Sequence, residues 1–271
     1  MPELPEVENA RRILLRAELP GRSITRANVG WAPTVKLPSL EDFVLGLPLK
    51  QILSVNRRGK YILLPLDSDE TFIIHLGMTG GVSVQPSDRE VDPMVRHTFS
   101  LDDGRVLWFR DSRKFGHLWL TSDLPSTLPP LGPEPLSDDL TVDYLSARFR
   151  DRNAPAKALL LEQSVVAGLG NLYVDESLFQ AHINPTRKAG GLTTAELESL
   201  KDCIVNSLTI AIAIYDRARD EHWPDPPSAL HTWTVPRTEG EPCPKCGTPI
   251  VALRVRARGT FLCPSCQPPE S

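Results

Sequence analysis

Four of the five cysteines form two Cys-x-x-Cys pairs near the C-terminus: Cys243, Cys246, Cys263 and Cys266. Residues 247–262 separate the two pairs, a spacing typical of zinc modules in which a hairpin joins two metal-binding turns. Four thiolates complete a tetrahedron and leave no coordination position open, so we expect one structural zinc ion, the alternative being two chance pairs. The remaining cysteine, Cys203, lies beside the apolar stripe of a predicted helix and is expected to be a small buried side chain.

The overall charge of the chain does not predict binding to a polyanion. The 271-residue chain has 30 Lys and Arg residues against 34 Asp and Glu residues, a formal net charge of −4 at pH 7. A nucleic-acid surface would therefore have to be a local basic face on an acidic body. The longest apolar run, residues 208–215, is far shorter than the ~20 residues of a membrane span, and the N-terminus lacks the basic and apolar regions of a signal peptide. We expect a cytoplasmic protein with no membrane contact.

Hydrophobic periodicity separates a β-rich first half from a helical second half. A helix is predicted over residues 3–19, and the short apolar runs with Gly-containing turns over residues 23–121 predict a β-sandwich or barrel. The Pro-rich residues 124–140 are predicted to be a linker. Helices are predicted over residues 156–163 and 172–182, on either side of a Gly-containing turn.

A longer helix is predicted to begin at Thr193, which forms a Thr-x-x-Glu capping-box signal with Glu196. The apolar residues of this helix recur at helical spacing and predict one buried stripe: Leu197, Leu200, Ile204, Leu208 and Ala211. The acidic, Pro-rich residues 220–228 are assigned no element.

Three arginines lie between the cysteine pairs: Arg254, Arg256 and Arg258. They form either a solvated charged face or a cationic finger that contacts phosphates, because a guanidinium matches a phosphate bidentately. Their spacing alone favours neither interpretation.

The chain opens with Met-Pro-Glu-Leu-Pro-Glu-Val-Glu and carries further short motifs along nearly its whole length. These motifs are Arg-Arg-Gly-Lys-Tyr at 57–61, His-Leu-Gly-Met-Thr-Gly at 75–80, Arg-Lys-Phe-Gly at 113–116, Gly-Pro-Glu-Pro-Leu at 132–136, Gly-Leu-Gly-Asn-Leu-Tyr at 168–173, Asp-Glu-Ser-Leu-Phe at 175–179 and Arg-Gly-Thr-Phe at 258–261. With the zinc module they resemble the formamidopyrimidine-DNA glycosylase / endonuclease VIII family, specifically its formamidopyrimidine-DNA glycosylase branch. Each motif alone is weak, but the collinear set is highly specific.

The family resemblance, together with the hydrophobic periodicity of the two halves of the chain, implies an α+β multidomain fold. We expect an N-terminal β-sandwich with a flanking helix over residues 2–123 and the Pro-rich linker over 124–140. A helix–two-turn–helix domain is expected over 141–230, followed by a zinc-ribbon finger over 231–271. This organisation would present a DNA-binding helical domain and a metal-ordered finger beside a catalytic sandwich.

The implied function is a bifunctional DNA glycosylase and abasic-site lyase of base-excision repair. It would remove oxidised bases, 8-oxoguanine and formamidopyrimidines, from duplex DNA through an N-terminal proline Schiff base and β,δ-elimination. We expect a monomer in the cytoplasm, associated with the nucleoid when it acts on DNA. The alternatives are the same chemistry on ring-opened purines or oxidised pyrimidines, as in endonuclease VIII, and a non-catalytic binder of DNA lesions.

The implied catalytic pair is Pro2 and Glu3. Removal of Met1 would leave Pro2 as a secondary amine, and an α-amino group, with a reference pKa of about 7.7–8.0, has a usable neutral fraction at cytosolic pH. Such an amine can attack the anomeric carbon of a sugar and expel the base. Glu3 can donate a proton to the sugar oxygen and later accept one, and a helix N-terminus favours its carboxylate. The alternative is an ordinary Pro/Glu helix start.

Four further positions take roles from the resemblance. Lys60 matches the catalytic lysine that assists base removal, although spacing alone favours a surface lysine. Lys157, Asn171 and Arg258 match residues that hold phosphates around the lesion. Gly168 and Gly170 would free backbone N–H groups at the start of the helix near Asn171, a cradle for an anion. Glu176 is either a helix-surface acid or a residue that supports the active site.

Met78, Arg113 and Phe115 match the trio that the family inserts into the duplex. An anomeric carbon inside stacked DNA cannot be reached by a pocket, so the nucleotide must turn out while apolar wedges and an Arg fill the gap. The alternative is that Met78 and Phe115 belong to the core and Arg113 to a turn.

Three segments depart from the family pattern. Residues 213–224 replace the expected Gly-Gly-Ser/Thr-Thr element and the loop that covers an everted 8-oxoguanine. Residues 235–240 replace a Tyr-Gly-Arg-x-Gly signature, and Ser112 stands where a Pro is usual. The aromatic ring of Trp223 is available for stacking, although a packed side chain is favoured. These departures leave the preferred lesion open.

Overall fold

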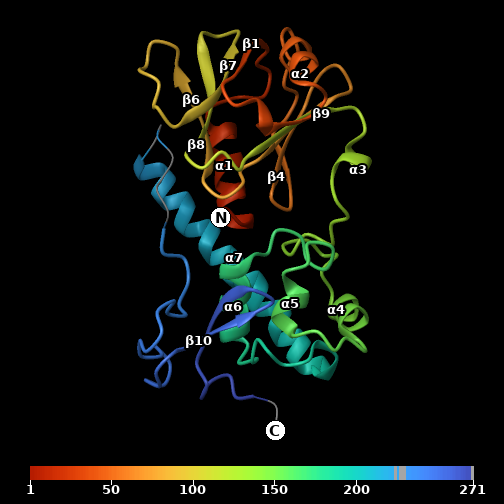
Figure 1. Ribbon diagram of the computed structural model, residues 1–271, viewed down its shortest axis with the longest axis vertical. Coiled ribbons are helices and arrows are strands. Elements are labelled where there is room, and N and C mark those ends of the chain that lie inside the picture. The colour runs from red at the N-terminus through yellow and green to blue at the C-terminus, as the bar shows by residue number, and fades with distance from the viewer. Residues whose placement is uncertain (223–224, 226–229, 270–271) are drawn as a thin grey trace. The chain divides into compact units, whose positions relative to one another are not determined.

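The computed structural model describes residues 1–222, 225 and 230–269, and Figure 1 labels its elements. The chain forms two compact units. The first consists of Met1–Pro129 with Ile214–Leu230, and the second of Pro130–Ala213 with His231–Ser271. Helix α7 (Thr194–His222) contributes residues to both units. In the described part of the chain, no helix combines the length and apolarity that a membrane span requires.

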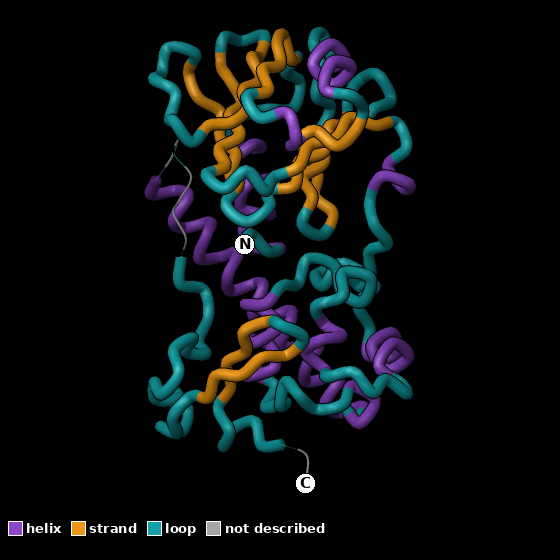
Figure 2. The backbone as a smooth tube through the Cα atoms, in the orientation of Figure 1, coloured by secondary structure: helices purple, strands orange, loops and turns teal. Residues whose placement is uncertain are grey.

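The first unit is a β-sandwich with a buried N-terminal helix. In chain order its elements are α1 (Leu4–Arg16), β1 (Ile24–Val29), η1 (Ala32–Thr34), β2 (Val35–Leu37), α2 (Leu40–Gly46), β3 (Asn56–Arg58), β4 (Tyr61–Pro65), β5 (Thr71–His75), β6 (Gly80–Pro86), β7 (Val95–Leu101), β8 (Arg105–Asp111), β9 (His117–Thr121) and α3 (Leu124–Thr127). One sheet has the strand order β1-β7-β8-β6 and the other β2-β9-β5-β4-β3. Figure 2 shows the strands of this unit in orange.

Apolar side chains from both sheets and from α1 and α2 form the core of this unit. The ring of Phe43 on α2 lies 5.6 Å from that of Phe72 on β5 and 6.5 Å from that of Phe99 on β7, so it joins the two sheets. On α1, Val7 and Leu14 face the same core. The predicted sandwich with a flanking helix is confirmed, and the helix predicted over residues 3–19 is observed over Leu4–Arg16.

The second unit is helical and ends in a hairpin. Its elements are α4 (Val142–Phe149), α5 (Ala156–Leu160), α6 (Asn171–Gln180), η2 (Ala189–Gly191), the first part of α7, and the antiparallel hairpin of β10 (Val251–Val255) and β11 (Arg258–Leu262). Two turns join α5 to α6 over residues 161–170. The predicted stripe on α7 is fully buried, and Thr193 and Glu196 form the predicted capping box.

Two predicted segments can be described further. Within the Pro-rich stretch 124–140, α3 occupies the start and the Gly132 N–H donates to the carbonyl of Gln163 at 2.8 Å. Residues 220–222 are the last residues of α7, not an irregular segment. Of the region 220–228, residues 223–224 and 226–228 lie outside the described residues, and so does the predicted packing of Trp223.

Candidate active site and metal centre

The N-terminal helix begins at the proposed catalytic pair. Glu3 is the N-cap of α1 and only 4% exposed, while Pro2 before it is half-buried. The Glu3 N–H donates to Oε2 of Glu6 at 2.8 Å, which satisfies one of the helix's unpaired donors. The Glu3 carboxylate therefore lies at the positive end of the helix dipole, where a negative charge is stabilised.

Lys60 lies in the turn between β3 and β4, and both strands pack against α1. Its side chain is 8% exposed, so it is not the freely solvated lysine that spacing favours. Burial, together with the positive charges of His117 and Lys60, lowers the pKa of His75 to about 4. Because the Gly77 N–H donates to Nδ1 of His75 at 3.3 Å, this imidazole is neutral at pH 7.

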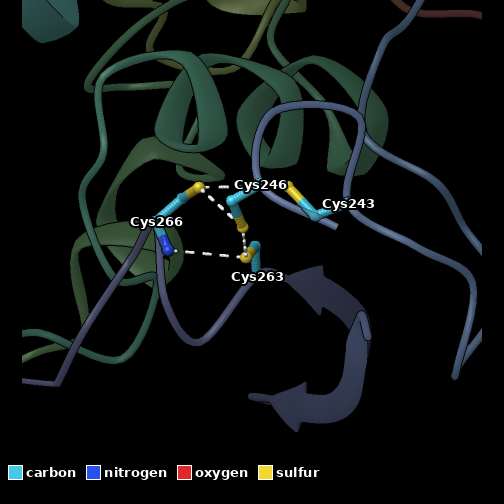
Figure 3. A group of neighbouring side chains, drawn as sticks. All are labelled: Cys243, Cys246, Cys263 and Cys266. Carbon is cyan, nitrogen blue, oxygen red and sulfur yellow. Dashed lines mark hydrogen bonds between the residues drawn. The ribbon is translucent and has the colours of Figure 1, made fainter. Parts of the chain in front are cut away.

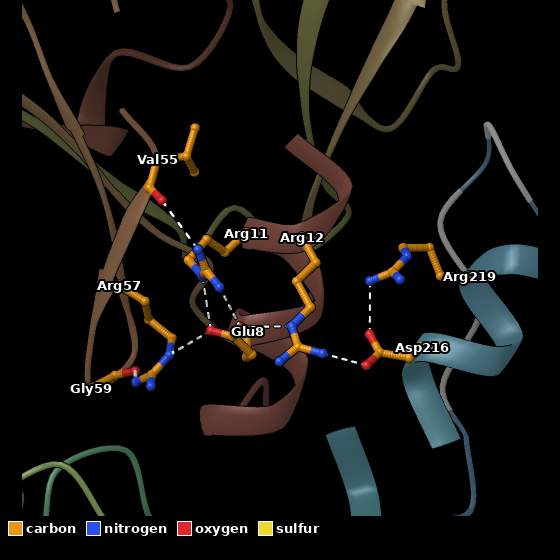
Figure 4. Close-up of polar contacts among 8 residues, drawn as sticks. All are labelled: Glu8, Arg11, Arg12, Val55, Arg57, Gly59, Asp216 and Arg219. Atoms are coloured by element: carbon orange, nitrogen blue, oxygen red, sulfur yellow. Dashed lines mark hydrogen bonds and ion pairs between the residues drawn. The ribbon is translucent and has the colours of Figure 1, made fainter. Parts of the chain in front are cut away.

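The Glu8 carboxylate on α1 accepts hydrogen bonds from three arginines (Figure 4). Glu8 accepts hydrogen bonds from Arg11 at 2.7 and 3.0 Å, from Nε of Arg12 at 2.7 Å and from Nε of Arg57 at 3.1 Å. Burial alone would raise the pKa of Glu8, but the hydrogen bonds from Arg11 and Arg12 and the charge of Arg57 lower it to about 2. Glu8 is therefore an anion throughout the physiological range.

Met78, Arg113 and Phe115 lie on neighbouring loops of the first unit. Met78 is in the β5–β6 turn, the other two are between β8 and β9, and the loops meet because β6 pairs with β8. Met78 is 41% and Phe115 46% exposed, and the Arg113 guanidinium carbon lies 4.9 Å from the centre of the Phe115 ring. Neither apolar side chain belongs to the core, so the alternative placement of Met78 and Phe115 there is wrong, while Arg113 does lie in a bend between two strands.

A buried carboxylate that sequence reasoning missed ties the two loops together. Oδ1 of Asp111 accepts from Oγ1 of Thr79 at 2.6 Å and from the Arg113 N–H at 3.2 Å, and Oδ2 accepts from the Gly116 N–H at 2.7 Å. Gly77 makes the close approach possible: its φ is +63°, and a Cβ there would lie 2.3 Å from the carbonyl oxygen of Phe115. The β5–β6 turn and the β8–β9 loop are therefore fixed relative to each other.

Lys157 has a different environment from the one predicted. Its side chain is 0% exposed, and Nζ donates to Oδ1 of Asp175 at 2.7 Å, to the Gly259 carbonyl at 2.9 Å and to Oγ1 of Thr260 at 2.8 Å. An ammonium has three N–H groups, so none remains for a phosphate. In this structure Lys157 therefore connects α5 to the start of β11.

Asn171 is the first residue of α6, and its Nδ2 donates to the same Gly259 carbonyl at 2.9 Å. The N-cap is Gly170, which provides no side-chain cap. Asn171 thus lies between the helix start and the finger hairpin.

Arg258 is the first residue of β11, next to the anchored Gly259. The tip of the hairpin is the two-residue turn Arg256–Ala257, whose φ angles are +44° and +63°. Arg256 pairs with Glu162 at 3.2 Å, whereas Arg258 is exposed and makes no ion pair among the described residues.

The four predicted zinc ligands converge (Figure 3). Their sulfur atoms lie within 4.8 Å of one another, with separations of 3.4 Å for Cys246 and Cys263 and 3.9 Å for Cys243 and Cys266. A tetrahedron with Zn–S bonds of about 2.3 Å has edges of about 3.8 Å, so these thiols fit one zinc ion with no open position. The single structural zinc is confirmed. Cys203, predicted to be buried, is half-buried.

The segment that leads into the finger is held by two acids of α6. Glu176 is buried and accepts from the N–H groups of Thr234 and Val235 at 2.9 and 3.0 Å, so it is not a helix-surface acid. Asp175 pairs with Arg237 at 3.1 Å, and Arg237 also stacks on the Phe261 ring. Arg237 lies in the segment that departs from the family signature, and no local motif signals its role.

The turn-linked helices α5 and α6, with the four-cysteine finger, define a zinc-finger protein of the helix–two-turn–helix class. Three family models match it: the formamidopyrimidine-DNA glycosylase N-terminal domain over residues 1–118, the formamidopyrimidine-DNA glycosylase H2TH domain over 131–220, and a zinc finger found in FPG and IleRS over 240–269. The chain belongs to the formamidopyrimidine-DNA glycosylase family.

Individual relatives match from end to end. The formamidopyrimidine-DNA glycosylase of Herpetosiphon aurantiacus is 41% identical over 274 residues, which cover 98% of this chain and 100% of the relative. That of a Roseiflexus species is 39% identical over 274 residues with the same coverage. A crystal structure of Lactococcus lactis Fpg in complex with DNA that contains Fapy-dG superposes with a TM-score of 0.88 at 32% identity, covering 98% of this chain and 100% of that chain.

Proposed function

We propose that this chain is a bifunctional DNA glycosylase and abasic-site lyase that removes oxidised bases from duplex DNA. Its relatives are formamidopyrimidine-DNA glycosylases, and its structural neighbours are bound to DNA containing Fapy-dG, carbocyclic 8-oxo-G or an abasic site. The observation that carries the proposal is Pro2, placed directly before the buried Glu3 at the start of α1. Because the substrate is DNA, the protein would act in the cytoplasm at the nucleoid. We propose that it acts as a monomer.

The chemistry follows from an N-terminal secondary amine. After removal of Met1, the Pro2 nitrogen attacks C1′, the bond from C1′ to the base breaks, and the base leaves with the electron pair and gains a proton. Glu3 protonates the sugar ring oxygen, so the ring opens to a cationic iminium. The iminium acidifies the C2′ protons, which permits loss of the 3′ phosphate and then of the 5′ phosphate. Water finally hydrolyses the iminium and frees Pro2.

The other residues position the substrate. Lys60 assists base removal, and Met78, Arg113 and Phe115 fill the gap that the everted nucleotide leaves. Arg258 and Asn171 hold phosphates, while Lys157 positions the hairpin that carries Arg258. Zinc, held by the four cysteines, orders this finger and takes no part in the chemical steps. The sandwich unit thus supplies catalysis, and the helical unit with its finger supplies DNA binding.

The test is covalent trapping on a duplex with one abasic site. With Met1 removed, as mass spectrometry verifies, borohydride should reduce the iminium to a stable protein–DNA adduct. Retained Met1 or an N-terminal tag should abolish the adduct, since the amine is then blocked. Tight binding of lesion DNA without any strand cleavage would instead favour a non-catalytic binder.

A second candidate keeps the chemistry but changes the lesion. Residues 213–222, which lack the family's Gly-Gly-Ser/Thr-Thr element, are helical, and Tyr215 and Ala218 are buried. This favours ring-opened purines or oxidised pyrimidines over 8-oxoguanine. A panel of single-lesion duplexes separates the two, and rapid excision of 8-oxoguanine eliminates this candidate.

A further inference from the structure

The Glu8 carboxylate has three arginine partners, whereas a simple ion pair has one. It is buried in the first unit and accepts hydrogen bonds from Arg11, Arg12 and Arg57, so one negative charge holds three positive ones (Figure 4). Arg11 and Arg12 lie on the same helix as Glu8, at the spacings of ordinary helix pairs. Arg57 comes from strand β3, and its contact connects two elements of the fold.

Arg57 is fixed at both ends of its guanidinium. Nε donates to Glu8, and Nη1 donates to the carbonyl oxygen of Gly59 at 3.0 Å. That carbonyl belongs to the peptide bond that joins Gly59 to Lys60. Because a guanidinium is planar and rigid, fixing two of its donors sets the orientation of this peptide relative to α1. The same helix begins at Glu3, so the chain of contacts runs from the helix of the catalytic pair to the catalytic turn.

We propose that Glu8 is a positioning residue that holds the Lys60 turn in register with the N-terminal catalytic pair, with Arg57 as the connecting side chain. The inference rests on the proposed function, because Lys60 takes its role from it. Glu8 itself touches neither the substrate nor the reacting atoms. Its influence is confined to the step in which Lys60 takes part, which is removal of the base.

The experiment compares two rates of the full-length, Met1-processed protein. Base excision from a duplex with one lesion needs Lys60, whereas cleavage of a duplex with a preformed abasic site has no base to remove. Glu8→Gln keeps the size of the side chain but loses its charge. We expect single-turnover excision to slow roughly ten- to a hundredfold, as for a catalytic group displaced by about an ångström, while abasic-site cleavage stays within about twofold.

Arg57→Gln provides a second route, because it removes the contacts of Arg57 with Glu8 and Gly59 and leaves Glu8 paired with Arg11 and Arg12. It should reproduce the selective loss of excision, and the double variant should be no slower than the slower single variant. The matched control is Asp216→Asn, which removes the partner of Arg12 on the other side of the cluster and leaves the Glu8–Arg57 contact intact. It should excise at the unmodified rate.

Equal loss of excision and abasic-site cleavage in both variants would overturn the inference, because Glu8 would then only stabilise the fold. Unchanged excision in Arg57→Gln would overturn it as well. A failure of the proposed function is distinguishable from either result, since the unmodified protein would then form no borohydride-trapped adduct.

Discussion

Replacement of Lys157 by Met should destabilise the second unit without removing a phosphate contact. The ammonium is fully buried and donates to Asp175, Gly259 and Thr260. Removing one partner of a buried ion pair costs about 3–5 kcal/mol, because the other charge is left uncompensated. Two features favour the lower value: Arg237 still pairs with Asp175, and burial already raises the pKa of Asp175 so that its carboxylate can take up a proton. We expect a loss of about 3 kcal/mol.

The assay combines thermal unfolding, zinc content and the salt dependence of binding to lesion DNA. A loss of about 3 kcal/mol lowers the melting temperature by roughly 10 °C, with zinc still at one ion per chain. Binding should weaken because the Arg258 hairpin loses its anchor, but the slope of log K against log salt should not change. Arg258→Ala is the control: it should leave stability and zinc content unaltered and reduce the slope by about 0.9, the value of one phosphate contact. If Lys157→Met melts normally and shows the reduced slope, Lys157 binds phosphate and our reasoning is refuted.

The remaining predictions concern the loops, the metal and pH. Asp111→Asn should impair excision in duplex DNA more than cleavage of single-stranded abasic DNA, because the loops of Met78 and Phe115 lose their common acceptor; equal effects on both substrates would contradict this role. Chelation of zinc should unfold the finger and weaken DNA binding, which circular dichroism and titration would detect; a chelated protein that binds normally would contradict the structural assignment. Burial lowers the pKa of His97 to about 4, so between pH 6.5 and 4 the unfolded chain binds more protons. Stability contributed by neutral His97 should therefore fall by about 3 kcal/mol as the pH drops through this window, and His97→Phe should flatten that part of a pH series of denaturation curves.

Local patterns in the sequence were sufficient for much of the fold. The cysteine spacing predicted the metal centre, the helical stripe from Leu197 to Ala211 predicted a buried face of α7, and the alternating runs predicted the sandwich. Each of these depends on residues close together in the chain, where spacing translates directly into a shared turn, face or strand. Proline content, by contrast, predicts an extended backbone but not what that backbone contacts, such as the hydrogen bond from Gly132 to Gln163.

The order of motifs along the sequence also determined which residues could carry the chemistry, Pro2 and Glu3 above all. Only the tertiary structure decided what surrounds them. Lys157 meets Thr260 across 103 positions, and Arg57 meets Glu8 across 49, so no local pattern signals either contact. Whether a lysine faces water, a phosphate or a buried carboxylate depends on desolvation and on its neighbours in space. Those are properties of the packed molecule, and a sequence read in order does not contain them.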